Sequence, residues 1–353
     1  MTKTKFISFV ILMALGTTLT AQQKTPSNRK FQTTFFHPIG TNGIKSTDYT
    51  NDFSFNMLLG VNGGVNKMEI GGLVNYNKGD VNGFQLSGIA NLNHGNSTGA
   101  LISGVCNILN EDSRGFQLAG VSNINCKSSK GVMISGVTNI SKQNATGFQL
   151  AVSNITNGNF KGTQLGVLNF AKTLNGTQLG VFNIVDSIGK GTPIGLFSIV
   201  KNGYYAIEIS TSEVMNANLT YKMGVEHFYT IFTTGYTKYK NKDVLKYGLG
   251  IGSLFSLGKK HQIALEAESS QLVYNNDWNK LNLLNTIKTN YHFRLNQKLS
   301  LVAGPTFNTY ITEKKTGNKY GTINVPYTIY DHESSKNKLF MWIGFNAGIS
   351  LRL

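Results

Sequence analysis

Apolar and polar residues alternate in short blocks through the middle of the chain, and these blocks repeat at a nearly fixed spacing. The block Gly83–Leu92 reads GFQLSGIANL, and similar blocks begin at Gly99, Gly115 and Gly131, each 16 residues after the one before. Later blocks begin at Gly147, Gly162, Gly176 and Gly191, with spacings that shorten to 15 or 14 residues. From Gly83 onward the charges of this region fall between the blocks, so each unit is predicted as an uncharged β-strand segment followed by a polar turn.

Two all-β architectures fit these 14–16-residue repeats. In a β-solenoid each unit is one coil, and identical residues of successive coils stack on one another. The stacked residues would include a ladder of side-chain amides, formed by Asn75, Asn91, Asn107, Asn123, Asn139, Asn154, Asn169 and Asn183. In the alternative, each unit is one antiparallel strand of a single continuous large β-barrel.

Single-residue deletions favour the solenoid. They fall at the Ser/Ala-Gly step of a block, as in Thr163–Phe170. Inside a strand, the loss of one residue would turn every later side chain to the opposite face, whereas at a solenoid corner it only tightens the bend. The turns between units are also similar in length, whereas barrels alternate short turns with longer loops. The alternation of Phe116 and Leu118 with Gln117 and Ala119 keeps the barrel alternative open.

The pattern changes to a period of two from Tyr204 onward, which predicts an antiparallel outer-membrane-type β-barrel. Eight strands are expected, at about 204–211, 218–223, 227–237, 244–256, 261–274, 281–293, 299–311 and 339–353. The connections between them alternate between short and long, as in membrane barrels. A barrel of eight strands has a lumen that side chains can fill.

The charges in these strands keep to one face, which is the lumen face of a membrane barrel. The candidate lumen charges are Glu266, Glu268, Lys288, His292, Arg294 and Arg352. We expect the two glutamates to pair with Lys288, Arg294 or Arg352.

The first 21 residues have the pattern of a secretory signal peptide, with a basic start, the apolar stretch Ile7–Leu15 and a small residue, Ala21, at the cleavage point. Four segments are expected: the signal peptide (1–21), lead-in strands (22–66), the repeat block (67–200) and the barrel strands (201–353). Within the lead-in, Phe31–Ile39 and Phe53–Val61 are interpreted as a hairpin. Export with a barrel predicts the outer membrane of a Gram-negative bacterium.

Composition agrees with a strand-rich chain, since it contains 39 Gly and only 5 Pro. Charged residues make up 14%, against about 25% in ordinary soluble domains. The net charge of +16 comes from Lys residues scattered through turns, with no nucleic-acid motif, so the partner expected is outer-membrane lipid and not nucleic acid. Cys106 and Cys126 fall at different positions of the repeat, which argues against a disulfide bond.

No pattern in the sequence points to catalysis. The six histidines lack metal-ligand spacing and no cofactor motif is present, so we expect neither an enzyme nor a cofactor or metal site. Glu266 and Glu268 lie two residues apart on one strand face, where salt bridges are a simpler role than glycosidic chemistry.

The tandem Gly-Xaa-Gln-Leu/Ile-Gly-Val-Xaa-Asn-Ile units resemble the bacterial surface-repeat proteins of Gram-negative envelopes. The lead-in at Gly40–Gly43 and Phe53–Gly60, and the exit at Pro193–Val200, are similar to the ends of such repeat blocks. The resemblance implies an envelope location and brings no catalytic residues.

Two functions follow from this organisation. The first is a structural or interaction protein of the outer membrane, whose repeats present Gln, Asn and Ser side chains to an envelope glycan or protein that the sequence leaves unidentified. The alternative is a porin or transporter in which the repeats are channel-lining barrel strands.

Overall fold

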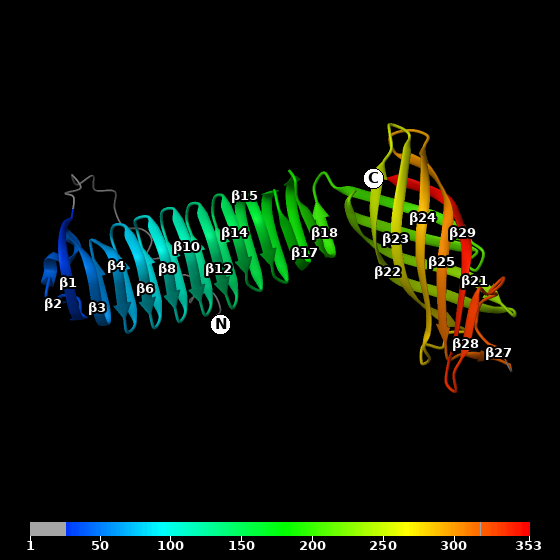
Figure 1. The fold of residues 1–353 in the computed structure, drawn as a ribbon, viewed down its shortest axis with the longest axis horizontal. Helices are drawn as coiled ribbons and strands as arrows, with labels where there is room; N and C mark the ends of the chain where they lie inside the picture. Colours follow the sequence, from blue (N-terminus) through cyan, green and yellow to red (C-terminus); the bar gives the residue numbers. More distant parts are fainter. Residues whose placement is uncertain (1–25, 318) are drawn as a thin grey trace, which may run out of the picture.

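A computed structural model of the chain describes residues 26–317 and 319–353. The predicted signal peptide lies outside the described residues. The fold is all-β, with a parallel solenoid of about nine turns followed by a closed eight-stranded antiparallel barrel. Figure 1 shows the two parts, with the solenoid extending from the side of the barrel. The predicted fold class is therefore confirmed, and the alternative of one continuous barrel is wrong.

The solenoid forms because the repeats pair in parallel, one period apart. Gly99 pairs with Gly115 and Gly115 pairs with Gly131, so equal residues occupy equal positions in successive coils. The strands are β1 (Ser27–Phe36), β2 (Ile39–Gly40), β3 (Tyr49–Asn62), β4 (Gly64–Gly71), β5 (Val74–Asn77), β6 (Val81–Ser87), β7 (Ala90–Asn93), β8 (Ser97–Ser103), β9 (Cys106–Leu109), β10 (Ser113–Ala119), β11 (Ser122–Asn125), β12 (Ser129–Ser135), β13 (Thr138–Ser141), β14 (Ala145–Leu150), β15 (Ser153–Leu165), β16 (Leu168–Leu174), β17 (Thr177–Ile188) and β18 (Thr192–Val200), with a 3-10 helix η2 (Gly43–Asp48) before β3.

The single-residue deletion in the fifth block is absorbed at a corner. Asn139 pairs with Asn154 and Met133 pairs with Gln149, so the strands on both sides of the corner keep their register. The lead-in strands join the same sheet, because β1 pairs with β3 in parallel. The predicted hairpin between these two segments is therefore wrong, since a hairpin would pair them antiparallel.

Glycine marks one bend in each regular coil because the backbone there has a positive φ. Gly131 has φ of 128°, and a Cβ atom at this position would come within 2.0 Å of the carbonyl oxygen of Gly115. Only glycine combines this backbone angle with so close an approach of the next coil.

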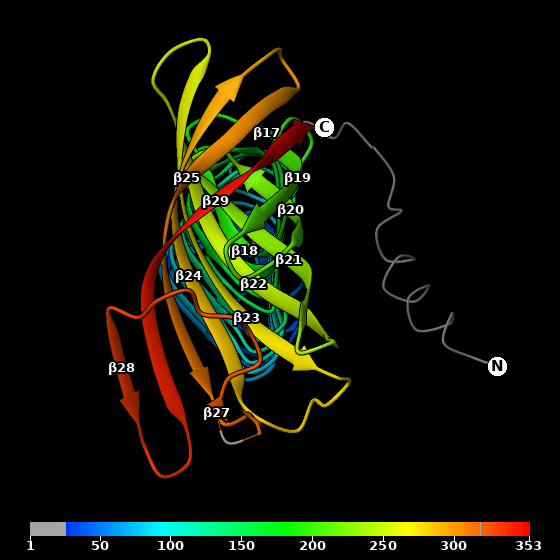
Figure 2. The same ribbon diagram turned by 90° about the vertical axis from the view of Figure 1, so that its right-hand side faces the viewer.

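The barrel closes when its last strand pairs with its first. Its strands are β19 (Tyr204–Ser212), β20 (Ala217–Val225), β21 (Phe228–Tyr239), β22 (Lys242–Ser256), β23 (His261–Tyr274), β24 (Asn282–Arg294), β25 (Leu299–Thr312) and β29 (Lys338–Arg352). The connection from β25 to β29 also contains β26 (Lys315–Thr316), β27 (Lys319–Tyr320) and β28 (Tyr330–Glu333). Viewed from the barrel side in Figure 2, the solenoid lies directly behind the barrel.

The last coil of the solenoid packs against the outer wall of the barrel. Thr230 on β21 donates a hydrogen bond from its hydroxyl to the carbonyl oxygen of Gly195 at 2.7 Å. The rings of Phe197 and Phe232 stack with centroids 5.6 Å apart. Val200 of β18 and Val225 of β20 also belong to one buried apolar cluster, which joins the solenoid to the barrel.

Candidate functional site

The solenoid interior contains many buried polar side chains beside apolar ones, and a continuous ladder of asparagine amides runs through it. Each Nδ2 of the ladder donates to the Oδ1 of the next asparagine, with N···O distances between 2.8 and 3.0 Å from Asn75 to Asn183. The eight side chains are fully buried. Most of them also donate to a backbone carbonyl of the following coil, as Asn123 does to Ile134 at 2.8 Å. The ladder therefore ties neighbouring coils together through side chains as well as through the backbone.

A second interior column is occupied mainly by glutamine. Gln149, Gln164 and Gln178 are buried and bonded in sequence, with distances of 2.8 and 2.7 Å. These positions contradict the expectation that the Gln and Asn side chains of the repeats face outward. The solenoid cannot offer them to a glycan or protein, because they fill its own core.

Glu69 takes the place of glutamine in the degenerate first block. Its Oε1 accepts hydrogen bonds from Asn56 at 2.8 Å and from Asn62 at 2.6 Å. Its Oε2 accepts from Asn77 at 2.7 Å and from Gln85 at 2.9 Å. Burial without a neighbouring cation outweighs these four bonds and raises the pKa of the Glu69 carboxyl to about 7.

The barrel lumen contains a buried network of ion pairs. Lys222 on β20 lies 2.7 Å from a carboxylate oxygen of Glu208 and 2.6 Å from one of Glu266. All three side chains are buried, and Tyr229 donates to the same oxygen of Glu266 at 2.7 Å. One carboxylate oxygen of Glu266 is thus bound by a charge and a hydroxyl from two other strands, whereas its Oε2 makes no hydrogen bond within the described residues.

A second part of the network is centred on Glu268, two residues after Glu266 in β23. Glu268 is 2.6 Å from the ammonium of Lys288 and 3.8 Å from that of Lys246. Sequence reasoning placed Glu266, Glu268, Lys288 and His292 on the lumen face, and all four side chains are buried there.

The two arginines among the candidate lumen charges do not join this network. Arg352 pairs with Glu226 at 2.5 Å, in the short turn between β20 and β21. Arg294 lines a small pocket with His292 and Arg352 at the same end of the barrel. Sequence reasoning missed Lys222, Lys246 and Glu208. Their alternation with apolar residues in β19, β20 and β22 was the signal that could have placed them on the lumen face.

The opposite end of the barrel is closed by apolar side chains and by the long loop. Trp342 and Tyr310 are fully buried, and Ile323 from the loop packs against them. The Tyr310 hydroxyl also lies 3.0 Å from the hydroxyl of Thr322 in the same loop. The lumen is thus occupied by ion pairs in the middle and by an aromatic and apolar cluster at the long-loop end.

The described residues contain neither a metal-ligand cluster nor a disulfide bond. Across residues 26–317 and 319–353, no group of His, Cys, Asp and Glu is arranged to hold a metal ion. Cys106 and Cys126 are both free thiols. Within the same ranges, no helix is long and apolar enough to cross a membrane.

Comparison with known proteins returned no match, whether to a protein-family model, to a curated protein or to a solved structure. The resemblance to surface-repeat proteins therefore rests on the repeat motif alone and stays a prediction.

Proposed function

We propose that this protein is a non-catalytic structural protein of the bacterial outer membrane, in which the barrel crosses the bilayer as a closed anchor and carries the solenoid. The observation that carries the proposal is the division of side chains across the barrel wall. Ion pairs are buried inside, whereas large apolar side chains cover the outside. This is the arrangement expected when the outer face meets lipid.

The apolar outer face extends around the barrel. Ile209, Leu249, Ile251, Ile287, Leu301, Phe307, Ile343, Phe345 and Ile349 are each at least 43% exposed and come from five of its eight strands. Monomeric soluble proteins rarely expose an apolar patch of more than a few hundred Å². The strands are also long enough, since β22 and β29 have 15 residues and a tilted strand needs about 9–11 to cross a bilayer.

The filled lumen supports an anchor over a porin. The Lys222 network and the Trp342 cluster occupy successive levels of the barrel. The porin hypothesis also relied on repeats that line a channel as barrel strands, and the repeats form solenoid coils instead. We therefore expect no steady unitary conductance when the purified chain is added to planar lipid bilayers.

The position of the barrel wall is tested by spin-label accessibility in liposomes. A background with Cys106→Ser and Cys126→Ser receives one new cysteine, either Ile287→Cys on the outer wall or Lys336→Cys in the long loop. The label at 287 should collide more with apolar oxygen than with a water-soluble nickel chelate, and the label at 336 should show the reverse. A water-like response at 287 would overturn the membrane assignment, and steady conductance would replace the anchor with a pore.

A further inference from the structure

The outside of the solenoid carries columns of apolar side chains. One column of side chains follows the Gly-Val corner of the coils and is between 37% and 52% exposed. It consists of Leu73, Ile89, Val105, Val121, Val137, Val152, Val167, Val181 and Leu196. The two walls that meet at this corner carry further outward columns, one running from Leu86 through Ile134 to Ile194 and the other from Leu92 through Ile140 to Ile184.

The charges lie at the opposite corner of each coil. Residues 73–200 contain eight basic and four acidic side chains, a net charge of +4. They are Lys78, Arg114, Lys127, Lys130, Lys142, Lys161, Lys172, Lys190, Asp80, Glu111, Asp112 and Asp186. All follow the second strand of a coil or precede the glycine bend of the next, so each coil has one apolar edge and one charged edge.

The junction with the barrel fixes where these two edges lie along the barrel axis. Thr192, at the charged edge of the last coil, lies 2.7 Å from the ring nitrogen of His227 in a short barrel turn. From there β18 runs alongside β21, past the Gly195–Thr230 hydrogen bond. The charged edge is therefore level with the short-turn end of the barrel.

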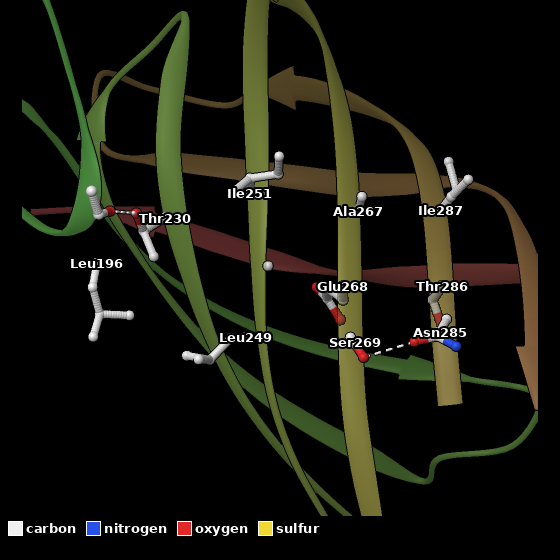
Figure 3. A pocket seen from close by; sticks show the side chains of 12 residues that line it. Leu196, Thr230, Leu249, Ile251, Ala267, Glu268, Ser269, Asn285, Thr286 and Ile287 are labelled. Atoms are coloured by element: carbon white, nitrogen blue, oxygen red, sulfur yellow. Dashed lines mark hydrogen bonds between the residues drawn. The ribbon is translucent and has the colours of Figure 1, made fainter. Parts of the chain in front are cut away.

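The apolar edge reaches the middle of the barrel wall. Gly195 and Leu196 line a pocket with Leu249, Ile251 and Ile287, which lie near the centres of β22 and β24. Figure 3 shows Leu196 across from these outward-facing side chains. The apolar surface of the solenoid is thus continuous with the apolar surface of the barrel at mid-height.

We infer that the solenoid lies within one leaflet of the membrane beside the barrel, with its apolar corner among the acyl chains and its charged corner at the lipid phosphates. This inference rests on the proposed membrane-spanning barrel. Thr192 and Leu196 are four residues apart, which is about 13 Å in a strand and close to half of a hydrocarbon core of roughly 30 Å. Because the short turns of such barrels face the periplasm, the leaflet is the inner one.

The hydrogen bonding of the solenoid fits a lipid environment. Each coil satisfies its backbone groups by pairing with its neighbours, and its amide side chains satisfy one another in the ladder. Backbone groups paired in this way need no water to satisfy them, as the hydrocarbon region of a membrane requires. The net positive charge of the opposite corner complements the phosphates of the lipid head groups.

The test uses the full chain in liposomes, with the same Cys106→Ser and Cys126→Ser background. Three single-cysteine variants carry a nitroxide label: Val137→Cys at the apolar corner, Lys130→Cys at the charged corner and Ile287→Cys on the barrel. The ratio of oxygen to nickel-chelate accessibility should be similar at 137 and 287, and severalfold lower at 130. Broadening by a lipid labelled near the acyl-chain terminus should also reach 137.

The outcomes separate the inference from the proposed function. A lipid-like response at 287 with a water-like response at 137 overturns the inference and leaves the membrane anchor standing. Protection of 137 from both reagents overturns it as well, because the corner is then covered by protein, such as a second copy. A water-like response at 287 removes the membrane anchor and the inference together.

Discussion

Asn123 donates a hydrogen bond from its Nδ2 to the Oδ1 of Asn139 at 2.9 Å, and the two residues occupy the same position in neighbouring coils. Its own Oδ1 accepts from Asn107 at 2.8 Å. The substitution Asn123→Ala would leave Asn107 without this acceptor and the carbonyl of Ile134 without a side-chain donor, so we expect a loss of roughly 2–4 kcal/mol. Thermal unfolding followed by circular dichroism in detergent measures it.

The control for the ladder is Asn157→Ala, which removes an exposed asparagine of β15 at an irregularity of its pairing. This variant should change stability by less than about 0.5 kcal/mol. Equal effects of the two substitutions would show that the ladder does not hold the coils together.

The ladder was predictable because stacking follows directly from repetition. Once equal spacing places Asn107, Asn123 and Asn139 in one column, the only remaining choice is which side of the strand faces inward. Alternation alone does not make that choice, because the interior holds polar columns together with buried apolar residues such as Leu101 and Phe160. The contacts of Val225 with the last coil, which decide the placement of the solenoid, come from a part of the chain outside the repeats.

The barrel was predictable strand by strand, since each strand keeps a period of two, but its network was only partly so. Glu266 and Lys288 are direct cross-strand partners, which register could suggest. The observed partner of Glu266 is Lys222, from a strand that is not adjacent. Which side chains meet across a lumen depends on strand tilt and stagger, which the sequence pattern does not encode.

Glu69 should make the first coils less stable as the pH rises. Its pKa is about 7 in the folded chain, against an ordinary value of 4.5 for an exposed glutamate, so the folded state holds the proton more tightly. The contribution of Glu69 to the free energy of unfolding is fully present below pH 4.5. It is lost as the pH rises to about 7, by roughly 3 kcal/mol in total. Hydrogen exchange of peptides from β3 to β6, measured between pH 4 and pH 8 and corrected for the intrinsic rate, would follow this change.

The substitution Glu69→Gln should remove this pH dependence and protect the same peptides at pH 8, because glutamine occupies the equivalent position in Gln85 of the next coil. Glu111→Gln, which changes a carboxyl in an outer turn paired with Lys127, should leave the pH dependence as it is. An unchanged pH profile in Glu69→Gln would mean that another group titrates.

Lys222 should be essential to the barrel, because it is the cation shared by Glu208 and Glu266. The substitution Lys222→Met leaves two buried carboxylates without their cation, and we expect a loss of roughly 3–5 kcal/mol. The temperature at which the barrel loses its compact migration in detergent gels should fall.

Neutralising the partners should restore that temperature. In the triple variant Lys222→Met, Glu208→Gln, Glu266→Gln the unpaired charges are gone, so most of the loss should be recovered. Failure of the triple variant to recover would indicate that Lys222 acts through packing and not through its charge.

Ser103 carries a buried hydroxyl that makes no hydrogen bond within the described residues. Its partner position in the next coil is Ala119. The substitution Ser103→Ala should therefore be neutral or should raise stability by up to roughly 1–2 kcal/mol, because an unpaired polar group leaves the core. Ser129 is the matched comparison, since its buried hydroxyl lies 2.6 Å from that of Ser141. Ser129→Ala should lower stability by about 1 kcal/mol. Chemical unfolding of both variants in the same detergent decides the point, since equal losses would mean that the Ser103 hydroxyl has a partner in solution.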